Sequence, residues 1–331
     1  MMQAARLFGT GDMRVVSVPD PVPGQNEVLI RIAAAGICGT DRHLFKGEFP
    51  CNPPVTLGHE FSGTVIANGP GADLALGALV TCDPNIACGV CDPCRRGRVN
   101  LCQNNIAIGI HRDGGFAEFA CIPANRAFPF PAGIDPAFAA FSEPLACTLH
   151  GMDMGAAQPG ERVIILGGGV IGMLALQLAA CAGAEVMLVT RQLDKRTLAQ
   201  TLGARETAGT HAEALRIWPQ GAELVVECAG VAETVAMAPA LTRAGGRIVI
   251  LGVLPQGERV AIEPFDLLFR EIQVLFSFLN PFTQSRAAAM IAAGQIAIAP
   301  LISRTIPLSE APRAIANPPL AGEIKVIVVP G

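Results

Sequence analysis

The chain has 331 residues, about half of them hydrophobic, and a formal net charge of −4. This length exceeds what one hydrophobic core usually serves, so two domains are expected. The slight acidity argues against a general binder of polyanions, and no nucleic-acid partner is expected.

The first 140 or so residues are predicted to form short β-strands separated by Gly and Pro. Residues 27–33 (EVLIRIA) and 61–67 (FSGTVIA) alternate between apolar and polar side chains, as half-buried strands do. No long helix is predicted before Pro136. The opening of the sequence, MMQAARLFGTGD, lacks a basic region followed by an apolar run, so no signal peptide and a cytoplasmic location are expected.

From Glu143 onward, predicted strands and helices alternate, which is typical of βαβ units around a parallel sheet. The tail adds a helix near 285–293 and a strand at 324–329. The strands are expected at 162–166, 185–190, 224–228, 247–251 and 272–278, and the helices at 170–182, 195–202 and 233–241.

Residues 163–184 carry no charge and are long enough to cross a bilayer. Three glycines, Gly167 to Gly169, interrupt this stretch, and a membrane-spanning helix would not favour them. We therefore expect a strand followed by a helix, and no membrane partner.

Gly167-Gly168-Gly169-Val170-Ile171-Gly172 matches the dinucleotide-binding pattern G-x-G-x-x-G between a predicted strand and helix. Gly167 allows the tight turn, Gly169 lets the backbone approach a pyrophosphate, and Gly172 allows close packing of helix and strand. The helix start, with Val170 and Ile171, directs free N–H groups at the phosphates.

The second predicted strand of this alternating region ends in Thr190-Arg191, with no carboxylate to hold the ribose 2′-hydroxyl of NAD. Arg191 is suited to a 2′-phosphate instead, so NADP(H) is the predicted cofactor and NAD(H) the alternative.

A cysteine-rich lobe carries the pattern C-x₂-C-x₂-C-x₇-C. Four thiolates close a tetrahedral shell, which predicts a structural zinc; an iron–sulfur cluster is the alternative. Arginines in the lobe raise the possibility of a nucleic-acid ribbon, against which the acidic total argues. The four ligands are Cys88, Cys91, Cys94 and Cys102.

Three other segments, GICGTDRH, GHEFSG and SEPLAC, supply a second set of donors: Cys38, His59 and a carboxylate from Glu60 or Glu143. Three protein ligands leave one position open for water or substrate, as in a catalytic zinc site.

Taken together, these motifs, with LGGGVIG and LVVECAG, resemble the zinc-containing medium-chain dehydrogenase/reductase family in its polyol dehydrogenase branch. The resemblance implies a GroES-like β-rich catalytic domain (1–141 and 280–331) around a Rossmann domain (142–279), with the active site in a cleft. It also implies that Cys38, His59 and Glu143 or Glu60 bind zinc, and that Glu60 and Glu143 can exchange as its ligand.

The same resemblance implies hydride transfer between an alcohol or polyol and the nicotinamide, with Thr40 and His43 passing the proton outward. Arg270 is expected to contact the phosphates of the cofactor. Relatives are homodimers or homotetramers, and 272–278 is a candidate edge strand for such contact. The rivals are a zinc-free quinone reductase on the same fold and a non-enzymatic zinc-binding module; the motifs do not identify which small-molecule alcohol is the substrate.

Overall fold

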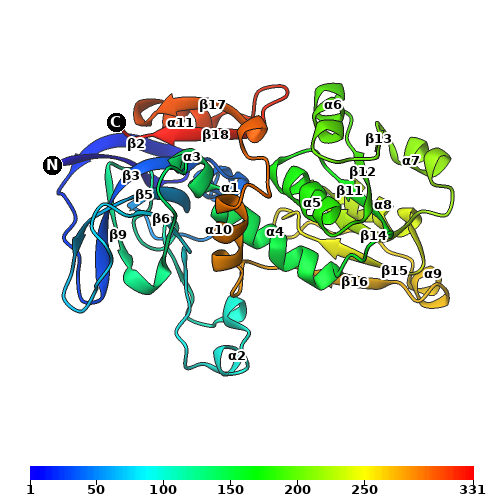
Figure 1. The fold of residues 1–331 in the computed structure, drawn as a ribbon, viewed down its shortest axis with the longest axis horizontal. Coiled ribbons are helices and arrows are strands. Elements are labelled where there is room, and N and C mark those ends of the chain that lie inside the picture. The colour runs from blue at the N-terminus through cyan, green and yellow to red at the C-terminus, as the bar shows by residue number, and fades with distance from the viewer. The chain divides into compact units, whose positions relative to one another are not determined.

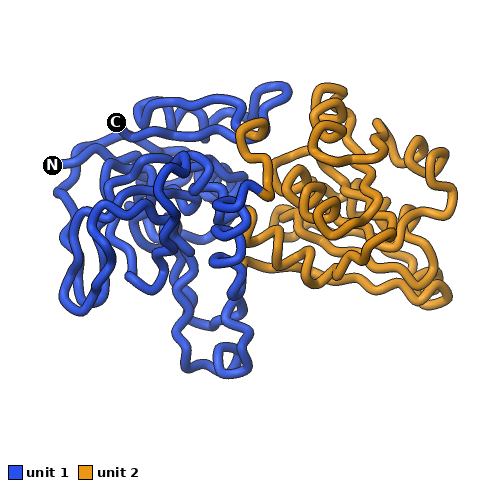
Figure 2. Tube along the Cα trace, in the orientation of Figure 1, with its two compact units in different colours: residues 1–144, 281–294, 302–331 blue, residues 145–280, 295–301 orange.

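The chain folds into two compact units, and each has its own hydrophobic core. The computed structural model describes residues 1–331; unit 1 comprises 1–144, 281–294 and 302–331, and unit 2 comprises 145–280 and 295–301 (Figure 2). Residues 295–301 and residue 280, expected in the first domain, belong to unit 2, and residues 142–144, expected in the second domain, belong to unit 1. Gln177 on the long helix of unit 2 holds segment 295–301, accepting from Ala297 N at 2.7 Å and donating to Ala297 O at 3.3 Å.

Unit 1 is built on β-strands, as expected. Its main sheet has the order β10-β6-β5-β3-β18-β17, with β9 pairing β3; β2-β1-β4 and β7-β8 form smaller sheets. The strands are β1 Met2–Gly9, β2 Asp12–Val18, β3 Glu27–Gly36, β4 Val55–Thr56, β5 Glu60–Asn68, β6 Leu79–Cys82, β7 Asn85–Ile86, β8 Ile106–Ala107, β9 Phe119–Pro123, β10 Ala127–Pro129, β17 Ile302–Pro307 and β18 Lys325–Val329.

Alternation of apolar and polar residues gives β3 a buried face with Val28, Ile30 and Ile32, whereas the first four residues of β5 are all buried. Phe61 of β5 and Phe116 are fully buried in the core of this unit. The lobe that carries α2 projects from the rest of unit 1 (Figure 1). The helices of this unit are short, namely α1 Gly39–Phe45, α2 Asp92–Arg95, α3 Pro136–Ala140, α10 Gln284–Ala292 and α11 Ala311–Ala316.

Unit 2 is a six-stranded parallel sheet of order β13-β12-β11-β14-β15-β16. Numbered along the chain this is 3-2-1-4-5-6, the doubly wound Rossmann order, so the predicted α/β class is confirmed. The strands are β11 Arg162–Leu166, β12 Glu185–Val189, β13 Glu206–Ala208, β14 Ala222–Glu227, β15 Thr242–Ile250 and β16 Gln273–Phe276, and the helices are α4 Ser142–Gly155 (which begins in unit 1), α5 Val170–Cys181, α6 Leu193–Thr201, α7 His211–Ile217, α8 Ala232–Leu241 and α9 Pro264–Phe269.

Four elements of unit 2 were not predicted, α4, β13, α7 and α9. The last three are short and lack a clear apolar period, whereas α4 is a helix of 14 residues that was not identified. The uncharged stretch 163–184 is divided, as expected, between β11 and α5. No helix is both long and apolar enough to cross a membrane.

Candidate active site

Antiparallel pairing of two strands in unit 1 assembles a first group of metal-binding side chains. Gly36, the last residue of β3, pairs with Glu60, the first of β5. Cys38 therefore follows one strand beside the point where His59 and Glu60 begin the other. One ligand atom each from Cys38, His59 and Glu60 lies within 4.8 Å of the others.

Asp41 orients this group from the first turn of α1. Its Oδ2 accepts a 2.8 Å hydrogen bond from Cys38 N, and its Oδ1 lies 3.4 Å from His59 Nδ1. This contact leaves Nε2 of His59 for a metal, the carboxylate–histidine arrangement that surrounds many zinc sites. A thiolate, an imidazole and a carboxylate fit zinc with an open fourth position.

The electrostatics of the group also fit a cation. Burial lowers the pKa of His59, but the negative charges of Asp41 and Cys38 outweigh it and raise that pKa well above its usual value. Such a surplus of negative charge in a buried place is what a divalent ion would neutralise.

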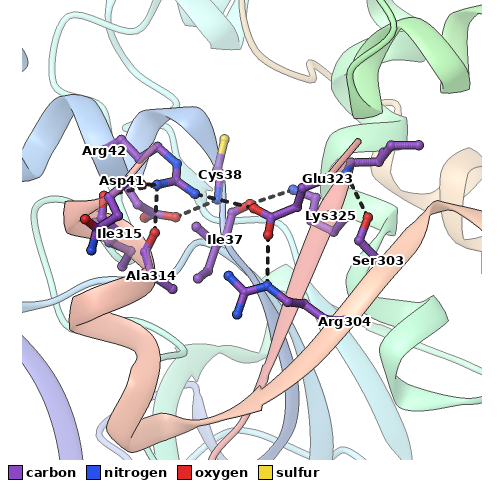
Figure 3. A network of polar contacts seen from close by, with 12 residues as sticks. Ile37, Cys38, Asp41, Arg42, Ser303, Arg304, Ala314, Ile315, Glu323 and Lys325 are labelled. Atoms are coloured by element: carbon purple, nitrogen blue, oxygen red, sulfur yellow. Dashed lines mark hydrogen bonds and ion pairs between the residues drawn. The ribbon is translucent and has the colours of Figure 1, made fainter. Parts of the chain in front are cut away.

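The C-terminal segment fastens α1. Arg42 Nη1 donates to Ala314 O at 2.7 Å, and its guanidinium lies 3.9 Å from Glu323, which also pairs with Arg304 Nε at 2.8 Å (Figure 3). The helix that follows Cys38 is thereby held by a residue 272 positions away in sequence.

The four cysteines of the lobe form the second metal-binding group, with their Sγ atoms all within 4.8 Å of one another. A tetrahedral Zn–S₄ centre has sulfur–sulfur separations of about 3.8 Å. The Sγ atoms of Cys91 and Cys102 lie 3.9 Å apart, which is close to this value. Backbone N–H groups of Val90 and Cys91 lower the pKa of Cys88 to about 6, whereas burial raises that of Cys94 to about 12. A bound cation would keep all four deprotonated.

In unit 2 the glycine turn leaves β11 and opens α5, with Gly169 as the N-terminal cap. Gly167 has φ +108°, a region that favours glycine, and a Cβ there would lie 2.9 Å from Ala229 N. A Cβ on Gly172 would overlap the Gly167 carbonyl oxygen, whereas one on Gly169 would meet nothing. The space kept free at Gly169 fits the close approach of a dinucleotide.

Comparisons with known proteins agree with this geometry. Residues 24–132 match the alcohol dehydrogenase GroES-like domain family, and residues 170–293 match the zinc-binding dehydrogenase family. A sorbitol dehydrogenase of Halalkalibacterium halodurans is 30% identical over 97% of each chain. The chain belongs to the zinc-containing medium-chain dehydrogenase family.

Solved structures extend this assignment. A protein of Sinorhizobium meliloti 1021 described as a zinc-binding dehydrogenase and bound to NADP is 54% identical, with a TM-score of 0.98 over 100% of this chain and 99% of the other. Galactitol-1-phosphate dehydrogenase of Escherichia coli is 29% identical, with a TM-score of 0.91 over 99% and 100%. These relatives place the dehydrogenase in the polyol branch, as an enzyme acting on CH–OH groups. The comparisons therefore favour a zinc-dependent dehydrogenase over the two alternatives, a zinc-free quinone reductase and a non-enzymatic zinc-binding module.

The structure of the dehydrogenase places the two candidate carboxylate ligands differently. Glu60 belongs to the ligand group, whereas Glu143, buried in the first turn of α4, lies outside it. The geometry thus favours Glu60 as the carboxylate ligand. Thr40 lies in the first turn of α1, and His43, one turn on, contacts Glu48 through Nδ1 and stacks on Phe49 at 4.6 Å between ring centroids.

The expected role of Arg270 is wrong. This arginine precedes β16, and Arg247 of β15 pairs with Gln273, so Arg270 lies at the amino edge of the parallel sheet. The glycine turn lies at the carboxyl edge. The guanidinium of Arg270 donates to Asp266 at 2.8 Å and to the Thr242 carbonyl at 2.6 Å, so this arginine has a structural role at the end of α9.

Several site residues of the dehydrogenase were missed or undervalued. Asp41 was not assigned a role, since an acid that directly follows a threonine has no distinctive pattern. Lys325 was overlooked, although a lysine that begins the apolar run Lys325–Val329 is a usable signal. Lys195 was not predicted either. A Cβ on Gly168 would lie 3.2 Å from Lys195 Cδ and from Thr190 Oγ1, so Lys195 and Thr190 flank the glycine turn.

Proposed function

We propose that this enzyme oxidises a secondary alcohol or polyol with NADP⁺, and reduces the matching ketone with NADPH. The observation that carries the proposal is the Cys38–His59–Glu60 group, whose three donors would leave a fourth position of a bound zinc for substrate. Zinc held there would supply a Lewis acid that lowers the pKa of the substrate hydroxyl, and the nicotinamide would accept the hydride.

Residues after β12 support NADP as the cofactor. Thr190 and the exposed Arg191 follow the strand tip, where no carboxylate competes for the ribose. Arg196 Nη1 donates to the carbonyls of Thr190 at 2.8 Å and Arg191 at 3.2 Å, which fixes this loop. Arg191 and Lys195 would then offer two cations to a 2′-phosphate. The relative of Sinorhizobium meliloti bound to NADP agrees with this choice.

Side chains of α1 would handle the proton. Thr40 in its first turn accepts the proton of the substrate hydroxyl and passes it towards His43, which releases it to water. Glu48 at Nδ1 and Phe49 against the ring hold the imidazole of His43 in one orientation. Asp41 keeps His59 oriented while Glu60 supplies the carboxylate.

The test is a zinc count together with a substrate panel. The purified enzyme should contain about two zinc ions per chain and reduce NADP⁺ with some secondary alcohols or polyols. Cys38→Ser should lose one zinc and nearly all turnover while keeping its fold, whereas Cys181→Ser, at an exposed cysteine, should retain both. Full activity in Cys38→Ser, or no activity with any alcohol, would overturn the proposal.

The assembly is proposed to be a homodimer or a tetramer built from such dimers. Strand β16 is an edge of its sheet with unpaired backbone groups, and Phe276 (70%) and Phe278 (55%) are exposed beside it. A second copy could continue the sheet there. Sedimentation should give at least a dimer, and Phe276→Asp should weaken it while Leu76→Asp, on unit 1, should not. A monomeric wild type would refute this.

A further inference from the structure

A buried lysine lies directly beside the proposed catalytic metal group. Lys325 Nζ is 2.5 Å from Glu60 Oε2, and both side chains are only 2% exposed. Nζ also donates to the Ile37 carbonyl at 3.0 Å, next to Cys38 (Figure 3). Neither the proton path nor the hydride chemistry uses this lysine.

The fold makes room for this pair. Strand β18 runs antiparallel to β3, with Ile327 opposite Gly36, so Lys325 reaches across the end of β3. A Cβ on Gly36 would overlap Glu60 Oε2 and lie 3.4 Å from Lys325 Cδ. Glycine at position 36 is thus required for Glu60 and Lys325 to meet there.

The charges explain what the lysine does. Three acidic groups, the buried Asp41 and Glu60 and the half-buried Cys38, lie close together, and an uncompensated buried carboxylate is strongly unfavourable. Lys325 Nζ contacts Glu60 Oε2 and so brings a positive charge against this buried carboxylate. The lysine compensates Glu60 whether or not a metal is present.

We propose that Lys325 is a built-in counter-ion, which holds Glu60 in position before zinc binds and limits how tightly the site then holds the metal. The inference rests on the proposed function of Cys38, His59 and Glu60 as a zinc site. Lys325 occupies one oxygen of Glu60 and leaves the other for the metal. Its positive charge also repels a divalent ion held by the same carboxylate. Lys325 is therefore a positioning residue.

The experiment compares wild type, Lys325→Met and Lys325→Arg, with Lys46→Met as an exposed control. Each is prepared with full zinc and again after brief chelator treatment to one zinc per chain, since the closed cysteine lobe releases its metal more slowly. Tm is measured in both states, and the release of the weaker zinc is followed with a chromogenic chelator.

In the chelator-treated state Lys325→Met should melt about 10 °C below wild type, because Glu60 is left buried without a partner. Full zinc should remove most of this difference. The weaker zinc should leave Lys325→Met about tenfold more slowly, because a nearby positive charge is gone. Lys325→Arg and Lys46→Met should stay close to wild type in both measurements.

If Lys325→Met does not fold, Lys325→Met with Glu60→Gln should, because it removes both charges together. A chelator-treated Lys325→Met as stable as wild type, a faster loss of its zinc, or a double variant that also fails to fold would overturn the counter-ion role. Wild type that binds only one zinc would instead refute the proposed function, and this inference with it.

Discussion

Asp41 Oδ1 lies 3.4 Å from His59 Nδ1, and neither atom has a hydrogen-bond partner elsewhere. Both side chains are buried, so their attraction is poorly screened by solvent. Asp41 thereby fixes the ring of His59 from outside the proposed ligand group.

Asp41→Asn keeps the shape of this side chain but removes its charge. We expect zinc affinity or kcat to fall about 10- to 100-fold, the usual cost of losing such a partner. Zinc retention against a chelator and initial rates measure the two effects. Asp12→Asn, at an exposed pair with Arg14, is the control. Unchanged zinc retention and unchanged kcat would show that Asp41 does not orient His59.

Substituting alanine at two glycines of the dinucleotide turn should affect different properties, cofactor binding at Gly169 and stability at Gly172. A methyl group at Gly169 meets no protein atom, so Gly169→Ala should leave Tm within about 1 °C of wild type while weakening NADP binding about tenfold by blocking the pyrophosphate. Gly172→Ala should instead destabilise unit 2, because its methyl would overlap the Gly167 carbonyl. Calorimetry and cofactor titration separate the two, and unaltered binding in Gly169→Ala would argue against the predicted cradle.

Arg191→Ala tests the choice of cofactor. Loss of a charged partner for the 2′-phosphate should raise KM for NADP⁺ about 10- to 100-fold and leave KM for NAD⁺ nearly unchanged. Adding Lys195→Met should extend the effect. Arg216→Ala, at an exposed arginine of α7, should alter neither value. An equal rise for both cofactors would mean that Arg191 does not read the phosphate.

The contribution of Glu227 to folding stability should depend on pH. Its Oε1 accepts from Ala229 N at 2.8 Å and Gly230 N at 2.9 Å, while Oε2 is buried without a partner. Burial raises its pKa above the usual 4.5, and the hydrogen bonds only partly oppose this. A raised acid pKa means that the folded state binds the proton more tightly, so its stability contribution is full below pH 4.5 and declines as pH rises towards the folded pKa.

Glu227→Gln removes that decline. At pH 7 the variant should melt at or a few degrees above wild type, and at pH 4 its advantage should vanish. Thermal melts at both pH values check this, with Glu233→Gln on the exposed start of α8 as the control. A loss of stability at pH 7 would show that the ionised carboxylate is needed by the loop after β14.

The sequence by itself determined the features built from neighbouring residues. The turn from Gly167 to Gly172 spans six positions, and its steric requirements are local. The cysteine lobe likewise closes within fifteen residues, so its spacing alone indicates a four-thiolate centre. The alternation of strands and helices predicted the parallel sheet for the same reason, since each period is read from adjacent side chains.

Only the tertiary structure decided the relations between distant residues. Lys325 and Ile37 are 288 positions apart, and they meet because β18 pairs with β3. In the same way, the pairing of β3 with β5 brings Glu60 beside Cys38, whereas Glu143 lies outside the group. Arg270 fell at the wrong edge of the sheet because strand direction and register, which are set by long-range packing, decide the end at which a residue emerges.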